Sequence, residues 1–97
     1  MQIKRNEKIV ARKIHDSYFL IDITDNYSNN TCALYEMNET GMFIWNNIGE
    51  GSSIFELASQ LKAIIIDDVI FQVLYDDVLE FIEWLDTRGF VEVINHG

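Results

Sequence analysis

Residues 35–45 constrain the fold most, because this stretch changes from strand to helix within one or two residues. Tyr35 and Met37 alternate with a glutamate in the period-2 pattern of a half-buried strand. Asn38 then offers a side-chain oxygen to the free N–H groups at the start of a helix. An apolar run follows, and Gly49 is a natural helix stop. A strand and a helix joined so closely must enclose the core between them.

The chain has 97 residues, of which 48% are hydrophobic and 24% charged. These values are typical of a globular protein, so we expect a single domain over residues 1–97. No apolar run is long enough to span a membrane and no signal-peptide pattern opens the sequence, which predicts a cytoplasmic location. Cys32 is the single cysteine, so an internal disulfide and a metal site built from several cysteines are excluded.

The net charge of −9 is unevenly distributed along the chain. Five of the seven basic residues precede residue 14, whereas fifteen of the sixteen acidic residues follow it. Such an acidic body repels nucleic acid and anionic membranes and attracts a neutral or basic partner. The alternative interpretation is that the charge only keeps a small protein in solution.

Alternating apolar and polar residues predict strands over 8–14, 18–23 and 31–37, with a turn at 15–17 and a loop at 25–30. The second strand is apolar on both faces, which favours the central position. Loops this short predict an antiparallel meander. A sheet of three strands leaves at least one edge open.

Three helices and a last strand are predicted after this sheet. The first runs from 39 to the glycine at 49, and Ser53 and Glu56 form a capping box for the second. Residues 63–66 fit either the tail of that helix or a buried connector. The third helix is expected to start from a cap at Asp67 or Asp68 and to end near Arg88, before a strand over 90–94.

The third helix carries an apolar arc of roughly 140°. One interpretation is that the whole arc faces the core. The other is that Ile70, Leu74, Phe81 and Leu85 face the core while other residues line a groove. Those groove candidates are Phe71, Tyr75 and Leu79.

Catalytic and metal-binding patterns are missing from the sequence. His15 and His96 have no spaced histidine or cysteine partner, and no glycine-rich phosphate loop occurs. Cys32 without a nearby histidine is more typical of a small buried hydrophobic residue than of a reactive thiol. We therefore expect no enzyme activity, no metal and no cofactor.

The order of the helices also fits a winged helix, a fold that often reads DNA through its third helix. Here that helix would bring a row of carboxylates to the phosphates, which argues against nucleic-acid binding. Peptide binding remains, because an open strand edge beside an apolar helix face favours the addition of a further strand. The alternatives are that the basic N-terminal arm covers this edge, or that a homodimer contact does.

Three segments in register resemble the PqqD family of ribosomal-peptide modification pathways, part of a wider group called RiPP recognition elements. Residues 35–45 (YEMNETGMFIW) are similar to the signature Y-x-L-N-x-T-G-x-x-I-W, with Met37 in place of the usual leucine. Residues 53–61 (SIFELASQL) match t-x-x-E-I/L-x-x-x-L. Residues 77–90 (DVLEFIEWLDTRGF) match D-V-x-x-F-L-x-x-L-x-x-x-G-L/F. The segment 63–66 is more apolar than its counterpart in the family.

This resemblance implies an α+β, winged helix-turn-helix-like domain with a three-stranded antiparallel sheet followed by three α-helices. It implies a peptide chaperone that binds the leader of a ribosomally made precursor peptide by strand addition and presents it to a modifying enzyme. The enzyme would be a radical SAM maturase or a leader peptidase, in PQQ-like or other pathways. The alternative is a winged-helix regulatory or protein-interaction module. The resemblance assigns peptide binding to Thr31, Cys32, Ala33, Leu34, Tyr35, Glu36, Phe71, Leu74, Tyr75 and Val78.

Overall fold

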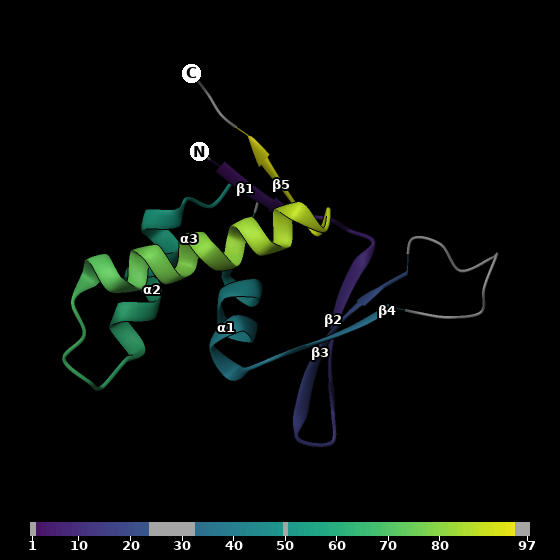
Figure 1. Ribbon diagram of the computed structural model, residues 1–97, viewed down its shortest axis with the longest axis horizontal. Coiled ribbons are helices and arrows are strands. Elements are labelled where there is room, and N and C mark those ends of the chain that lie inside the picture. Colours follow the sequence, from purple (N-terminus) through teal and green to yellow (C-terminus); the bar gives the residue numbers. More distant parts are fainter. Residues whose placement is uncertain (1, 24–32, 50, 95–97) are drawn as a thin grey trace.

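The structure is a computed structural model that describes residues 2–23, 33–49 and 51–94. Figure 1 shows the helices gathered on one side of the molecule and a three-stranded sheet on the other. The elements, in chain order, are β1 (Gln2–Arg5), β2 (Ile9–Ile14), β3 (Ser17–Asp22), β4 (Ala33–Met37), α1 (Glu39–Asn47), α2 (Ile54–Ile64), α3 (Phe71–Thr87) and β5 (Val91–Ile94).

The predicted antiparallel meander is confirmed, with strand order β2-β3-β4 and the second predicted strand in the centre. A tight turn joins β2 to β3, and His15 takes a positive φ of 55° in it. The three helices follow as expected. The predicted loop at 25–30 lies outside the described residues.

The N-terminal segment is a strand, although the charge pattern suggested an arm. β1 pairs antiparallel with β5, so the molecule has a second, two-stranded sheet. Ile3 of β1 is fully buried, and its N–H and C=O groups bond to the backbone of Ser52 at 2.7 and 3.1 Å. The basic arm is therefore engaged with β5 and does not cover the edge of the larger sheet.

Two of the predicted helix starts are confirmed. The Oδ1 atom of Asn38 accepts a hydrogen bond of 2.7 Å from the N–H of Gly41. The Oγ atom of Ser53 accepts one of 3.1 Å from the N–H of Glu56. These bonds satisfy N–H groups that have no partner inside the helix, and each such cap contributes about 1 kcal/mol. The first helix ends with Ile48 as its C-cap, so that Gly49 directly follows the helix end, as predicted.

The predicted start of the third helix is wrong. α3 begins at Phe71 after Ile70, and no side chain caps it. Asp67 instead accepts a backbone hydrogen bond from Val69 within the preceding turn, and the Nζ atom of Lys62 donates to the Val69 carbonyl. These bonds hold the connection in a non-helical path. The helix ends as predicted, with Gly89 at φ +75°.

The segment that was predicted as either helix tail or buried connector is largely exposed. Ile64 is the last residue of α2 and is 56% exposed, while Ile66 is fully exposed. Residues 63 and 64 are thus the tail of α2, whereas Ile65 and Ile66 lie in the connection, with Ile65 partly buried against the core. Each of the two interpretations therefore holds for only part of this segment.

The core lies between the helices and the inner face of the sheet. α3 contributes four buried residues at helical spacing. Trp45 of α1 and Ile48, the C-cap of that helix, are also buried in the core. Ile70, which was predicted to face the core, is 72% exposed, and Phe81 is only half-buried. The apolar arc of α3 therefore extends beyond the core. The four buried residues of α3 are Leu74, Val78, Ile82 and Leu85.

Candidate functional site: an open strand edge and the groove beside it

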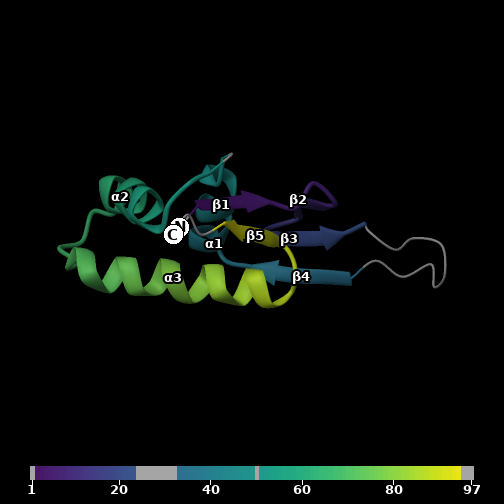
Figure 2. The same ribbon diagram turned by 90° about the horizontal axis from the view of Figure 1, so that it is seen from above.

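β4 is an edge strand. It pairs with β3 on one side, and within the described residues no strand pairs with its other side. Figure 2 shows β4 alongside α3, with β2 at the opposite border of the molecule. An edge strand presents unpaired backbone groups to whatever lies beside it.

The register identifies which β4 residues carry those groups. The N–H of Ile23 bonds to the carbonyl of Lys8 at 3.0 Å, which sets the phase of the β2–β3 ladder. Because bonded pairs alternate along an antiparallel ladder, residues 18, 20 and 22 of β3 direct their backbone groups to β4. Their partners are residues 37, 35 and 33. Leu34 and Glu36 therefore direct their N–H and C=O groups to the open edge.

A groove of about 400 Å³ lies between this edge and α3. Its wall on α3 is aromatic, because the rings of Phe81 and Trp84 stack with 9° between their planes and 6.2 Å between their centroids. Tyr35 supports this wall from β4, with its ring edge-on to Trp84 and to Phe90. We call this the β4–α3 groove. It is lined by Glu36, Met37, Asn38, Asp77, Glu80, Phe81 and Trp84.

A second hollow of about 430 Å³ continues the groove past the start of α1. The two hollows share Asn38, Asp77 and Phe81. The second reaches Leu61 and Ile65 at the end of α2. Together they form a channel along one flank of α3.

The charge in the β4–α3 groove is negative. Glu36, Asp77 and Glu80 line it, and within the described parts of the chain none of the three has a basic partner within 4.0 Å. The basic residue Arg88 contacts the aromatic wall at Trp84. Its guanidinium stacks 3.8 Å from the centroid of Trp84 and donates to the Trp84 carbonyl at 3.1 Å. Unpaired carboxylates along a groove favour a ligand that brings basic side chains.

Residues 27–91 match the family model described as "Coenzyme PQQ synthesis protein D (PqqD)", which covers more than half of the chain. The chain belongs to the PqqD family. The resemblance of the three sequence segments is thereby confirmed.

Solved structures share the fold of this PqqD-family chain. One is TbiB1 in complex with the TbiA(beta) leader peptide, at 19% identity and a TM-score of 0.73, covering 96% of this chain and 99% of that one. Another is lasso peptide synthetase B1 complexed with the leader peptide, at 15% identity and the same TM-score, covering 96% and 100%. The predicted fold class is confirmed by this likeness. No curated protein matches the chain closely enough to count as a relative.

The predicted strand residues of this PqqD-family member lie at the open edge, as far as they are described. Ala33, Leu34, Tyr35 and Glu36 belong to β4. Leu34 is 55% exposed, whereas the ring of Tyr35 faces α3. Thr31 and Cys32 lie outside the described residues.

The predicted helix residues are divided between two sides of α3. Leu74 lines the second hollow and so belongs to the channel. Val78 is fully buried in the core. Phe71 and Tyr75 lie on the other flank, where Phe71 contacts Phe55 of α2 with 5.3 Å between ring centroids. The structure therefore brings Leu74 to the channel beside β4 and does not bring Phe71, Tyr75 or Val78 there.

Four groove residues of α3 were not predicted from the sequence. Asp77, Glu80 and Trp84 were assigned to no site, and Phe81 was assigned to the core. One pattern in the sequence could have indicated these residues. Ile70 and Val73 lie at helical spacing on the same flank as Phe81 and Trp84, with the acids between them. Ile70 and Val73 are exposed, as expected for a surface that the core does not use.

The described residues contain no group of three or more histidine, cysteine or acidic side chains placed to hold a metal ion. No helix among them is long and apolar enough to cross a membrane.

Proposed function

We propose that this PqqD-family protein binds the leader segment of a ribosomally made precursor peptide by strand addition to β4. It would hold the leader in the β4–α3 groove and present the rest of the peptide to a modifying enzyme, such as a radical SAM maturase or a leader peptidase. The observation that carries the proposal is the open edge at Leu34 and Glu36 beside an aromatic-walled groove. The leader peptides in the two solved complexes of similar fold support it.

The opposite edge of the sheet is less suited to strand addition. Arg12 and Lys13 belong to β2, and Lys8 directly precedes it. The guanidinium of Arg12 donates a hydrogen bond of 2.8 Å to the carbonyl of Ala11. Charged side chains and blocked carbonyls are devices that protect edge strands from pairing. β4 has one charged residue in five, and among the described residues no side chain is seen to bond to its outward-facing carbonyl groups. The contrast favours β4 as the edge that receives the peptide.

An added strand would be recognised in two ways. Its backbone would bond to Leu34 and Glu36, and each of these hydrogen bonds would contribute about 0.5–1.5 kcal/mol net. Its alternate side chains would face the groove, where Phe81 and Trp84 favour apolar residues. The unpaired carboxylates of Asp77 and Glu80 favour lysine or arginine in the leader.

In this role the protein is an accessory factor and supplies no catalytic group. Binding and positioning of the substrate would be its whole contribution, and the reaction would take place on the partner enzyme. The alternative is a regulatory winged helix. Its recognition helix would be α3, whose exposed side carries Asp76, Glu80 and Glu83 and would repel phosphates.

Calorimetric titration with synthetic peptides tests the proposal. The leader half of the precursor peptide should bind saturably with one site, whereas a scrambled peptide of the same composition should not. A parallel titration with duplex DNA distinguishes the alternative. Salt-sensitive binding of the duplex without leader binding would overturn the proposal.

A further inference from the structure

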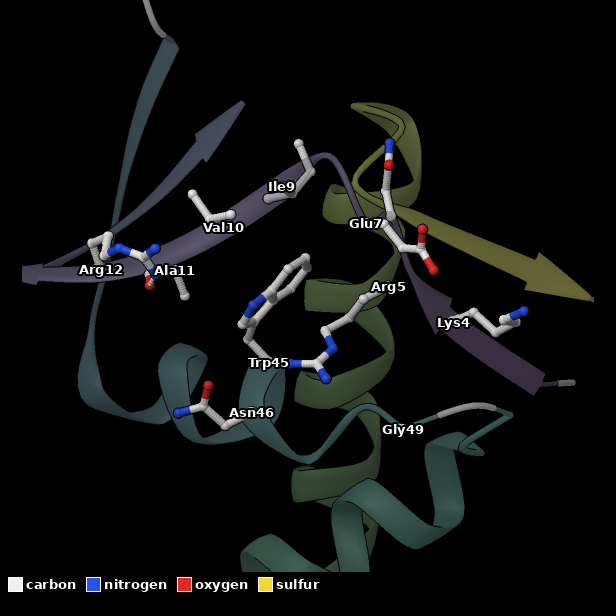
Figure 3. Close-up of a pocket in the computed structure, with 11 residues that line it drawn as sticks. Lys4, Arg5, Glu7, Ile9, Val10, Ala11, Arg12, Trp45, Asn46 and Gly49 are labelled. Atoms are coloured by element: carbon white, nitrogen blue, oxygen red, sulfur yellow. Dashed lines mark hydrogen bonds between the residues drawn. The ribbon is translucent and has the colours of Figure 1, made fainter. Parts of the chain in front are cut away.

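A separate hollow lies on the side of the molecule away from the β4–α3 groove. It has a volume of about 550 Å³ and is formed by β1, the start of β2 and the end of α1. In Figure 3, Arg5 and Arg12 lie on either side of the indole of Trp45. The guanidinium of Arg5 is 5.9 Å from the centroid of that ring. We call this hollow the basic pocket. It is lined by Lys4, Arg5, Asn6, Glu7, Ile9, Val10, Ala11, Arg12, Trp45, Asn46 and Gly49.

The cations of the basic pocket are not neutralised within the molecule. In residues 2–23, 33–49 and 51–94, no carboxylate lies within 4.0 Å of the charged groups of Lys4, Arg5 or Arg12. Lys8 lines an adjoining hollow with Lys4 and Arg5, and it also lacks an acidic partner there. This is unexpected in a chain with sixteen acidic residues and a net charge of −9. Among the residues that line the pocket, Glu7 is the one acid, and it pairs with none of these cations. The pocket therefore keeps an excess of positive charge that an external anionic group can pair with.

We propose that the basic pocket is the docking site for an acidic segment of a protein partner. The modifying enzyme is the partner that the proposed function implies. Only that identification rests on the proposed function, because the pocket and its charge are independent of the leader. The occupant would place one or more Asp or Glu side chains between Arg5 and Arg12, where bidentate arginine–carboxylate pairs can form.

The composition of the pocket favours a protein segment over a nucleic acid. Trp45 is only 2% exposed, so its ring offers no face on which a base could stack. The walls instead include Ile9, Val10 and Ala11, which suit aliphatic side chains next to the carboxylates. The net charge of −9 adds long-range repulsion of a polyanion. A short segment with both acidic and aliphatic side chains would pair with the arginines and also pack against the aliphatic wall.

The position of the pocket allows both ligands to bind at the same time. β2 and β4 are the two borders of the sheet, with β3 between them. Figure 2 shows β1 and β2 on one side of the molecule and β4 and α3 on the other. A partner held at the basic pocket would therefore leave the β4–α3 groove open. The partner could therefore bind this protein while the leader is bound, without displacing the leader.

The test uses a synthetic peptide of alternating glutamate and leucine and its lysine–leucine counterpart. Each is titrated into the full-length protein while the backbone amides and the indole N–H of Trp45 are followed by NMR. We expect the acidic peptide to shift the signals of Arg5, Arg12 and Trp45, with an affinity that falls as salt is added. The basic peptide should leave these three signals in place. Shifts that spread over the whole surface, or none at the pocket, would overturn the proposal.

Charge-matched variants separate a specific site from diffuse attraction. Arg5→Gln and Arg12→Gln each remove one charge from the pocket, and Lys13→Gln removes one from β2 outside it. The pocket variants should lower the affinity for the acidic peptide at least fivefold, and Lys13→Gln less than twofold. Equal losses in all three would contradict a built site. If the occupant of the pocket were a second copy of the protein, the free protein would self-associate through it, and both arginine variants would abolish the self-association. That result would also contradict the proposal.

The same variants distinguish this proposal from the proposed function. Arg5→Gln and Arg12→Gln should leave leader binding unchanged, because neither residue lines the β4–α3 groove. If the leader fails to bind while the acidic peptide still requires both arginines, the proposed function fails and the docking site stands. Reduced leader binding in the arginine variants, with unchanged thermal stability, would show one shared surface and would overturn the second site.

Discussion

Tyr35 of β4 meets Trp84 of α3 edge to face, with 6.1 Å between their ring centroids. This contact connects β4, whose edge is open, with α3, which forms the opposite wall of the groove. Edge-to-face pairs contribute about 0.5–1.5 kcal/mol beyond their buried area, so the contact fixes the spacing of the two elements. A peptide that adds to β4 therefore meets a preformed wall.

Trp84→Leu should weaken leader binding about tenfold, because it removes one of the two aromatic rings that form the wall of the groove. Loss of one well-buried aromatic contact of 1.4 kcal/mol corresponds to about that factor. The measurement is a calorimetric titration with the leader peptide. Phe55→Leu is the matched control, since Phe55 is an exposed aromatic residue of α2 on the far flank of α3. Equal losses for both variants would contradict the assignment of the groove.

Leu34→Pro should abolish or strongly weaken leader binding while the protein stays folded. The N–H of Leu34 points to the open edge, so proline removes a donor to the peptide and none to β3. We expect at least a tenfold loss of affinity. Leu34→Val keeps the N–H and should bind like the parent protein. Circular dichroism checks the fold, and normal binding by the folded proline variant would exclude this edge.

Asp77→Asn and Glu80→Gln should each reduce the affinity for a leader that carries lysine or arginine. Exposed ion pairs contribute about 0.2–1 kcal/mol, so the expected loss is about two- to fivefold at low salt and should vanish at high salt. Glu83→Gln is the control, because Glu83 is exposed and lies outside the groove. A loss that persists in high salt would indicate a different cause.

Ile3→Ala should destabilise the protein by about 2–5 kcal/mol, because Ile3 is fully buried where β1 meets β5 and Ser52. Lys4→Ala, one residue further along an exposed side, should change the free energy of unfolding by less than about 0.5 kcal/mol. Urea denaturation measures both. If the two variants were equally stable, β1 would be a loosely held arm rather than part of the fold.

The sequence allowed most of the fold to be predicted, because its local signals and its packing agree. The cap at Asn38, the cap at Ser53 and the stop at Gly89 are local hydrogen-bonding and backbone preferences, and the structure contains each of them. The signature around Gly41 also has a structural reason. A Cβ atom at this position would lie 3.3 Å from Asn38 Oδ1 and 3.4 Å from the ring of Phe81, so a larger residue would crowd the groove.

The errors concern features that depend on distant parts of the chain. β1 is a strand because β5 lies beside it, and four residues with three polar side chains carry no such signal alone. The start of α3 moved because the Asp67 carbonyl and Lys62 stabilise a turn, which overrides a good capping residue. Helical periodicity gave the apolar arc of α3 but not its orientation, so it could not show which flank faces β4. Phe71 and Tyr75 were chosen on one flank, whereas Phe81 and Trp84 line the groove on the other.

The most direct test of strand addition is the hydrogen exchange of single backbone amides, measured by NMR with and without a saturating synthetic leader peptide. Strand addition predicts that the exchange of the Leu34 and Glu36 amides slows at least tenfold. The exchange of the Tyr35 amide should change little, because this N–H group already points to β3. Saturable binding of the leader with no added protection at Leu34 and Glu36 would contradict the account.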